Sequence, residues 1–150
     1  MDDPFDLQRF VTAQDAGGTY DGALAELRAG RKTGHWMWFV LPQLAGLGRS
    51  ATARHYALRS ADEAQAYLGH PVLGARLREC AQALVALRTS DPVSVLGSVD
   101  AQKLRSSMTL FARTAPDEPV FRQVLDRCFG GAEDPLTHEL LDRSGQPPTG

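Results

Sequence analysis

The spacing of apolar residues predicts a chain made mainly of helices. The clearest pattern runs from Pro71 to Arg88, where apolar side chains recur at steps of four and three: Leu73, Leu77, Cys80, Leu84 and Leu87. Such spacing puts them on one face of a helix. Pro71 suits the first helical position, where an N–H would have no partner in the helix. We therefore predict that this helix forms the centre of the core.

Shorter helices are predicted on both sides of it, because capping residues and glycines bound segments of helical period. Ser60 and Glu63 form the capping-box pattern, in which each side chain satisfies an amide of the first turn. Helices are expected, in chain order, from the cap Asp6 to Gly17-Gly18, from Thr19 to Gly30, from Ser50 to Leu58, from Ala61 to near Gly69, at Asp91-Pro92, from Ser98 or Asp100 to Arg113, from Pro119 to Gly130, and after Asp134-Pro135.

The segment Gly34–Gln43 is too uniformly apolar to be classified by its period. Pro42 argues against a helix that runs through it, so we interpret the segment as buried and extended or irregular. A small β element near Trp36–Leu41 stays open. The predicted fold is a mainly α, compact, multi-helical single domain over residues 1–143, followed by a flexible tail over residues 144–150 that is rich in Gly, Pro, Ser and Thr.

Composition indicates the class of protein and argues against several kinds of partner. The 150 residues, 43% of them hydrophobic and 23% charged, are typical of one globular domain. The 16 basic and 18 acidic residues give a net charge of -2 and look mixed along the chain, so no global charge indicates nucleic acid or anionic lipid as a partner. No apolar run is long enough to cross a membrane, and the start of the chain does not look like a signal peptide, so we expect a cytoplasmic protein. Cys80 and Cys128 fit buried free thiols, and no metal or cofactor is expected.

The segment Lys32–Ser50 departs most from the packing pattern and is the first candidate site. Aromatic faces beside cations suit a planar, phosphorylated ligand, since a base can stack while a cation meets the phosphate. Glycines 46 and 48, just before a helix, resemble an anion cradle, with a plain turn as the alternative. Core packing is the alternative for the tryptophans. The expected ligand-binding residues here are Lys32, Trp36, Trp38, Gln43, Arg49 and Ser50.

A second cluster of candidate residues lies on the helix predicted from Ser98 or Asp100 to Arg113. Lys103, Ser106 and Ser107 stand at i, i+3 and i+4 and thus on one side, which indicates either a phosphate- or sugar-binding face or a solvated one. We expect Lys103 to converge with Lys32, His35 and Arg49 on one cavity. His35 is a candidate general acid or base, and so are the nearest carboxylates, Asp21 and Glu26, of which Glu26 is preferred. A solvated helix face is the alternative for both acids.

These residues resemble a known family. The chain is similar to the bacterial family called domain of unknown function 1810 over about residues 5 to 142. The motifs that carry the likeness include Arg9-Phe10, Gly30-x-Lys32, His35-Trp-Met-Trp-Phe39, Pro42-Gln43, Gly46-Leu-Gly48-x-Ser50 and Lys103-Leu-x-Ser-Ser-Met-Thr-Leu-Phe111. Some members carry the label calpastatin, which implies a disordered inhibitor and does not fit this helical pattern. A more distant likeness to the NADAR superfamily implies ADP-ribose-type ligands and hydrolysis of an N-glycosidic bond.

Three functional hypotheses follow. In the first, an enzyme binds a phosphorylated nucleoside-type ligand and Glu26 activates water or stabilises an oxocarbenium-like centre, while Lys32, Arg49 and Lys103 hold phosphates. The second is a non-catalytic binding module for the same small molecule, with no acid or His pointing into the pocket. The third is a protein-interaction domain with a flat apolar patch. The sequence leaves the oligomeric state open.

Overall fold

The computed structural model describes residues 3–145 and is helical throughout its regular elements. The helices are α1 (Gln8–Asp15), a 3-10 turn (Ala16–Gly18), α2 (Thr19–Ala29), α3 (Met37–Val40), α4 (Ala51–His55), α5 (Ala61–Gly69), α6 (Leu73–Ala86), α7 (Pro92–Leu96), α8 (Ser98–Thr114), α9 (Pro119–Phe129) and α10 (Pro135–Gly145).

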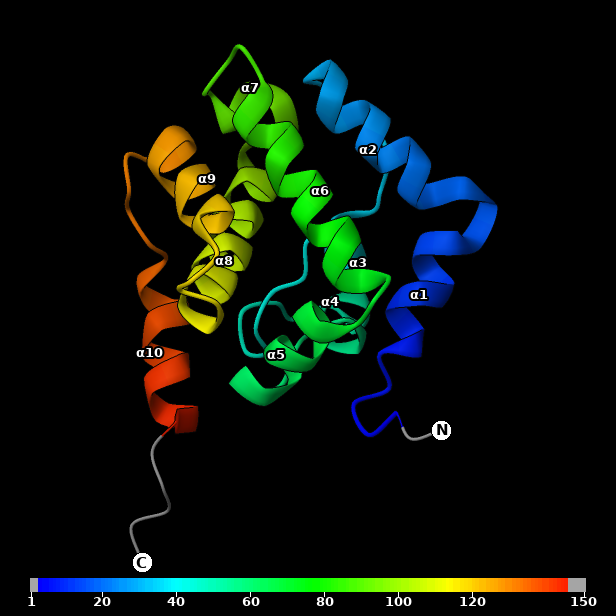
Figure 1. The fold of residues 1–150 in the computed structure, drawn as a ribbon, viewed down its shortest axis with the longest axis vertical. Helices are drawn as coiled ribbons and strands as arrows, with labels where there is room; N and C mark the ends of the chain where they lie inside the picture. Colours follow the sequence, from blue (N-terminus) through cyan, green and yellow to red (C-terminus); the bar gives the residue numbers. More distant parts are fainter. Residues whose placement is uncertain (1–2, 146–150) are drawn as a thin grey trace, which may run out of the picture.

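Two long helices organise the domain. α6 packs against α2, α5 and α9, and α8 packs against α5, α7, α9 and α10. In Figure 1, α6 runs across the middle of the molecule, with α1 and α2 to one side and α8, α9 and α10 to the other. The short helices α3, α4 and α5 close the lower part of the view. The predicted compact, mainly α domain is thus confirmed.

The predicted central helix is also confirmed. Four residues of its stripe are buried, at 0 to 2% exposure: Leu73, Leu77, Cys80 and Leu84. Leu87 lies just past the end of α6 and is partly buried. The helix begins two residues after Pro71, and its first turn is capped by His70, whose Nδ1 accepts hydrogen bonds from the amides of Val72 and Leu73. The apolar pattern therefore located this core helix, and a histidine cap set its start.

The segment around Trp36 is irregular, as one of our two alternatives had it, and the extended alternative and the β element are wrong. Met37–Val40 form one helical turn, α3, and Leu41 leaves the helical region with φ -127° and ψ 73°, as the residue before a proline tends to do. The described chain holds no β-strand, only an isolated parallel bridge between Leu44 and Leu58. A long-range contact fixes the turn, because the buried Gln14 side chain donates a hydrogen bond to the carbonyl of Phe39.

The start of α1 differs as well. Asp3, rather than Asp6, caps this helix, because its carboxylate accepts from the amides of Leu7 and Gln8. These hydrogen bonds hold the pKa of Asp3 below its usual range. Asp6 instead takes a left-handed backbone conformation, with φ 52°.

At the other end, α10 continues to Gly145, so the chain is still helical where the tail was expected to begin. The remainder of that tail, residues 146–150, lies outside the described residues. Among the helices of residues 3–145, none combines the length and apolarity that a membrane crossing requires.

Candidate functional site

The loop after α2 is held by Glu26. Its Oε1 accepts hydrogen bonds from the amides of Thr33 and Gly34, at 2.7 and 2.9 Å, and from the indole N–H of Trp36, at 3.0 Å. Partial burial by itself would raise the pKa of this carboxyl, but the hydrogen bonds outweigh it and keep the pKa below its usual range. Glu26 therefore acts as an ionised anchor that orders the loop.

Two lysines share one carboxylate beside this loop. Lys32 Nζ lies 2.7 Å from Asp100 Oδ2 and also donates to the carbonyl of Gly34. Lys103 Nζ lies 3.4 Å from the other oxygen, Asp100 Oδ1. Because its contact is the shorter one, Lys32 is the main ion-pair partner of Asp100, and the Lys32 side chain is only 9% exposed. The ammonium group of Lys103 therefore keeps donors available for another partner.

The main groove of this region lies next to Lys103. It has a volume of about 540 Å³ between the loop before α4, α4 itself and the first turns of α8. The Lys103 ammonium lies 4.5 Å from the centroid of a Trp38 ring, so cation and aromatic face stand together in the groove. Its lining residues are Trp38, Gln43, Leu47, Gly48, Arg49, Ser50, Ala53, Val99, Gln102 and Lys103.

The glycines of the loop shape this groove. A Cβ on Gly48 would lie 2.5 Å from the Cβ of Ala53, so only glycine lets the loop pass this close to α4. Gly46 has φ 102°, a conformation that favours glycine. Ser50 caps α4 by accepting the amide of Ala53 at 3.0 Å. A turn packed against a capped helix explains the glycines, and the hydroxyl proton of Ser50 is still free to donate.

The structure brings together five of the predicted ligand-binding residues and separates the others. Trp38, Gln43, Arg49, Ser50 and Lys103 line the groove. The expected convergence is correct for Arg49 and Lys103 and wrong for Lys32 and His35, which do not line it. Lys32 is tied to Asp100, and His35 is exposed on the preceding loop. Glu26 also lies outside the lining, with its Oε1 already accepting three hydrogen bonds.

Three further predicted ligand-binding residues are buried instead. Trp36 is 2% exposed and belongs to the core, so its face is not available to stack a base. Ser106 donates to Asp134 Oδ2 and supports the cap of α10, since the same carboxylate accepts from the amide and hydroxyl of Thr137. Ser107 is fully buried, and its Oγ has no hydrogen-bond partner within the described residues.

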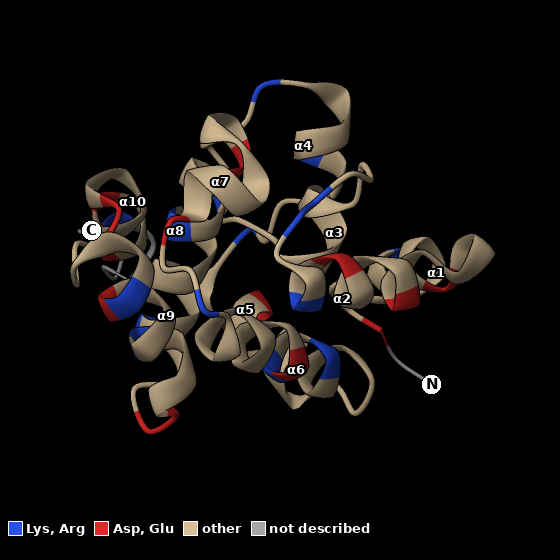
Figure 2. Cartoon of the chain, turned by 90° about the horizontal axis from the view of Figure 1, so that it is seen from above, with Lys and Arg blue, Asp and Glu red and all other residues tan. Residues whose placement is uncertain are grey.

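Charge is segregated along the chain, contrary to the mixed pattern inferred from the totals. Residues 27–61 contain six of the 16 Lys and Arg residues and none of the 18 Asp and Glu residues. Figure 2 shows blue and no red on α4, which lies within this stretch. The signal was present in the sequence, but counting charges over the whole chain concealed it.

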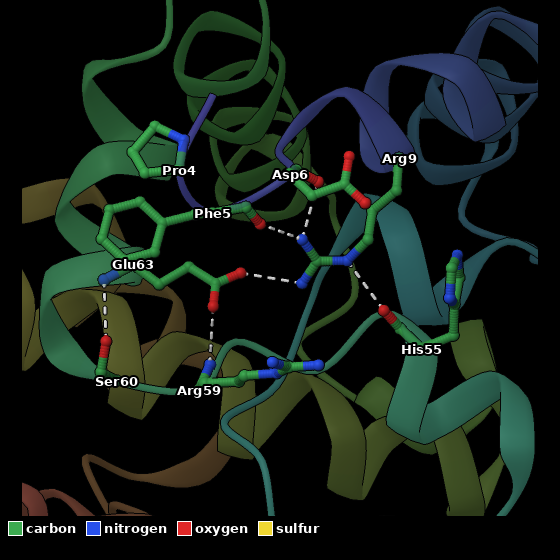
Figure 3. A pocket seen from close by; sticks show the side chains of 8 residues that line it. All are labelled: Pro4, Phe5, Asp6, Arg9, His55, Arg59, Ser60 and Glu63. Carbon is green, nitrogen blue, oxygen red and sulfur yellow. Dashed lines mark hydrogen bonds and ion pairs between the residues drawn. The ribbon is translucent and has the colours of Figure 1, made fainter. Parts of the chain in front are cut away.

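A second cavity, of about 320 Å³, lies where α1, the end of α4 and the start of α5 meet. Figure 3 shows Arg9 at its wall, surrounded by oxygen atoms. All five N–H donors of Arg9 are used, on the carbonyls of Phe5, Asp6, His55 and Ala57 and on Glu63 Oε2. Glu63 Oε1 accepts the amide of Arg59. This pair therefore fastens three segments together and has no donor left for a ligand.

Other chemistry is sparse in the described residues. His, Cys, Asp and Glu side chains of residues 3–145 nowhere form a group of three or more that could hold a metal ion. Burial raises the pKa of the Cys80 thiol to about 12, so this cysteine is a poor nucleophile at neutral pH. Burial raises the pKa of Cys128 as well. The groove beside Lys103 is thus the best candidate for a ligand site.

Comparison with known proteins places this arrangement in a family. A family model described as "Protein of unknown function (DUF1810)" matches residues 4–141. The chain belongs to this family. The crystal structure of the conserved hypothetical protein Rv1873 from Mycobacterium tuberculosis is 49% identical, with a TM-score of 0.90 over 93% of this chain and 99% of that one. No curated protein matches the chain. These matches confirm the DUF1810 family and the helical fold, and they give no support to a relationship with the NADAR superfamily.

Proposed function

We propose that this DUF1810 protein is a binding module for a planar, phosphorylated small molecule of the nucleotide class. The observation that carries the proposal is the pairing of the Lys103 ammonium with the face of Trp38, 4.5 Å apart, inside a groove of about 540 Å³. Ligand pockets usually fall in the range of roughly 300–1,000 Å³, so the groove has room for a nucleotide. An aromatic face next to a cation matches a base next to a phosphate.

The remaining lining offers three kinds of contact. Arg49 is exposed, and its guanidinium has no hydrogen bond or ion pair within residues 3–145, so it can reach a phosphate as a second cation. Gln43 and Gln102 offer amide groups that both donate and accept, as the edge of a base requires. Leu47 and Val99 add apolar surface to the same groove, where a flat ring can be covered.

We propose that the groove binds the ligand, and we do not propose that it hydrolyses it. Among the described residues that line the groove there is no Asp, Glu or His to activate water. Glu26, the acid predicted for that role, already serves the loop after α2. Hydrolysis of an N-glycosidic bond stays a prediction of the sequence, and a chromatographic assay for released base, run on the unmodified protein with ADP-ribose, tests it directly.

Titration calorimetry tests the binding proposal. AMP, ADP and ADP-ribose are compared with adenosine and with inorganic phosphate, and we expect the phosphorylated nucleosides to bind more tightly than either part alone. Lys103→Ala should weaken binding by about 1.5–3 kcal/mol, the range for a charged hydrogen bond. Trp38→Ala should weaken it as well, whereas Trp38→Phe keeps an aromatic face and should lose less.

The matched control is His35→Ala, since His35 is exposed and lies outside the groove lining. This variant should bind as the unmodified protein does. An absence of heat with every one of these ligands would refute the proposal. Equal losses in His35→Ala and Lys103→Ala would show that the ligand binds somewhere other than this groove.

A further inference from the structure

We propose that the nucleotide in the groove is one unit of a single-stranded nucleic acid, and that an arginine strip beside the groove binds the phosphates of neighbouring units. The arginine strip consists of Arg49, Arg54 and Arg59. The inference rests on the proposed function, because the same groove takes the base. It adds a partner class that the net charge of -2 conceals.

The strip has no internal counter-charge. It lies within residues 27–61, which contain six Lys and Arg residues and neither Asp nor Glu. Elsewhere in the chain, acids neutralise arginines in ion pairs: Arg9 pairs with Glu63, and Arg113 pairs with Glu133. The three arginines of the strip are exposed, and their side chains make no hydrogen bond or ion pair within residues 3–145. Unpaired cations with no acid between them in the sequence create a local positive potential that attracts phosphates.

The strip begins in the groove and leads out of it. Arg49 lines the groove together with Trp38 and Lys103, and Arg59 lines the second cavity, the one beside Arg9. Only α4 and a short turn separate the two places, and five helical residues rise about 7.5 Å. Phosphates of a stacked strand follow one another at about 3.4 Å along the axis, so a few nucleotides are enough to run past the length of α4.

Unpaired acids also lie near this path. Asp6 lines the same cavity as Arg59, is exposed, and has no partner for its carboxylate within the described residues. The other acid there, Glu63, is already paired with Arg9 at 2.8 Å. The exposed Asp62 follows Arg59 by three residues, and its carboxylate also has no partner within the described residues. Phosphates that reach Arg59 therefore meet the repulsion of Asp6 and Asp62, and Asp6→Asn should tighten the binding of a longer strand.

The chemistry favours a single strand over other polyanions. Stacking on Trp38 needs a base whose face is free, which a duplex does not offer along its length. An acidic peptide could meet the arginines but has no planar base for the ring of Trp38. Proteins that bind single strands without sequence preference combine stacking aromatic rings with a basic groove along the backbone. Here Trp38 would supply the stacking ring and the arginine strip the cations.

The test compares ligands of increasing length. Fluorescence anisotropy and tryptophan quenching follow binding of a thymidine mononucleotide and of oligo(dT) and oligo(U) of two, four and eight units. We expect at least a tenfold gain in affinity from one to eight units. The octamer affinity should fall with salt at a logarithmic slope of about -2, as three phosphate contacts to a single strand predict.

Variants separate the strip from the groove. The double change Arg54→Ala and Arg59→Ala should lower octamer affinity at least fivefold and leave mononucleotide affinity unchanged. Arg88→Ala is the matched control, because Arg88 is an exposed arginine outside the strip, and it should change neither affinity. An octamer that binds no more tightly than the mononucleotide overturns the inference and leaves the proposed function intact. If neither the mononucleotide nor the octamer binds, the proposed function is refuted too. If polyglutamate competes as well as the octamer does, the strip binds an acidic protein instead.

Discussion

The role of Glu26 gives the sharpest prediction about stability. Glu26→Ala removes the acceptor of three hydrogen bonds and leaves the indole N–H of the buried Trp36 without its partner. A hydrogen bond to a charged group contributes about 1.5–3 kcal/mol, but three bonds to one oxygen do not add, so we expect a total loss of about 3 kcal/mol. Glu26→Gln keeps an oxygen acceptor without the charge and should cost about 1 kcal/mol.

Urea unfolding followed by circular dichroism measures both values. The control is Glu139→Ala, since Glu139 forms an exposed ion pair with Arg143 within α10 and should contribute at most about 0.5 kcal/mol. The lowered pKa of Glu26 sets the direction in which its contribution to stability changes with pH. The contribution of Glu26 to stability is complete at pH values above the usual pKa of glutamate, and it is lost as the pH falls through the lower pKa of the folded state. The difference in free energy of unfolding between the unmodified protein and Glu26→Gln should therefore disappear at acid pH. A Glu26→Ala variant no less stable than the control would refute the anchoring role.

Three further changes test the packing. Gly74→Ala would bring a Cβ to 2.0 Å from the carbonyl oxygen of Leu68, so it should lower the melting temperature although alanine favours a helix by about 1 kcal/mol. Arg9→Lys keeps the charge but cannot replace five donors, and urea unfolding should show a loss of about 2–4 kcal/mol; a loss below 1 kcal/mol would contradict the fastening role. The raised pKa of Cys80 predicts that a thiol reagent at pH 8 labels Cys128 first, which Cys128→Ser checks, since that variant should react only on unfolding.

Periodicity predicted the helices well wherever one face of the helix is buried. The stripe of α6 and the caps at Ser60 and Asp134 were visible because each depends on residues close in the sequence. α3 was missed for the opposite reason. Its residues are apolar on all sides and carry no period, and the hydrogen bond from Gln14 to Phe39 that helps to fix the turn spans 25 positions.

The residues that line the candidate groove were predicted in part, and one group of errors comes from spacing on α8. Residue types identified Trp38, Arg49 and Lys103, because an aromatic ring among cations stands out in any segment. Spacing on α8 then suggested that Ser106 and Ser107 share a face with Lys103. Since α8 packs against four other helices, most of its second half has no solvent face, and spacing alone does not tell a ligand-facing serine from a buried one.

The candidate groove depends on the loop that Glu26 anchors, although no atom of Glu26 lines it. The loop positions Lys32, Lys32 binds Asp100 at 2.7 Å, and Asp100 meets Lys103 at 3.4 Å over the ring of Trp38. Neutralisation of Asp100 by the first lysine leaves the second free for an anion. The residues that looked like one site in the sequence thus divide into two layers, a buried layer that fixes the position of one cation and an open layer that we propose binds a phosphate.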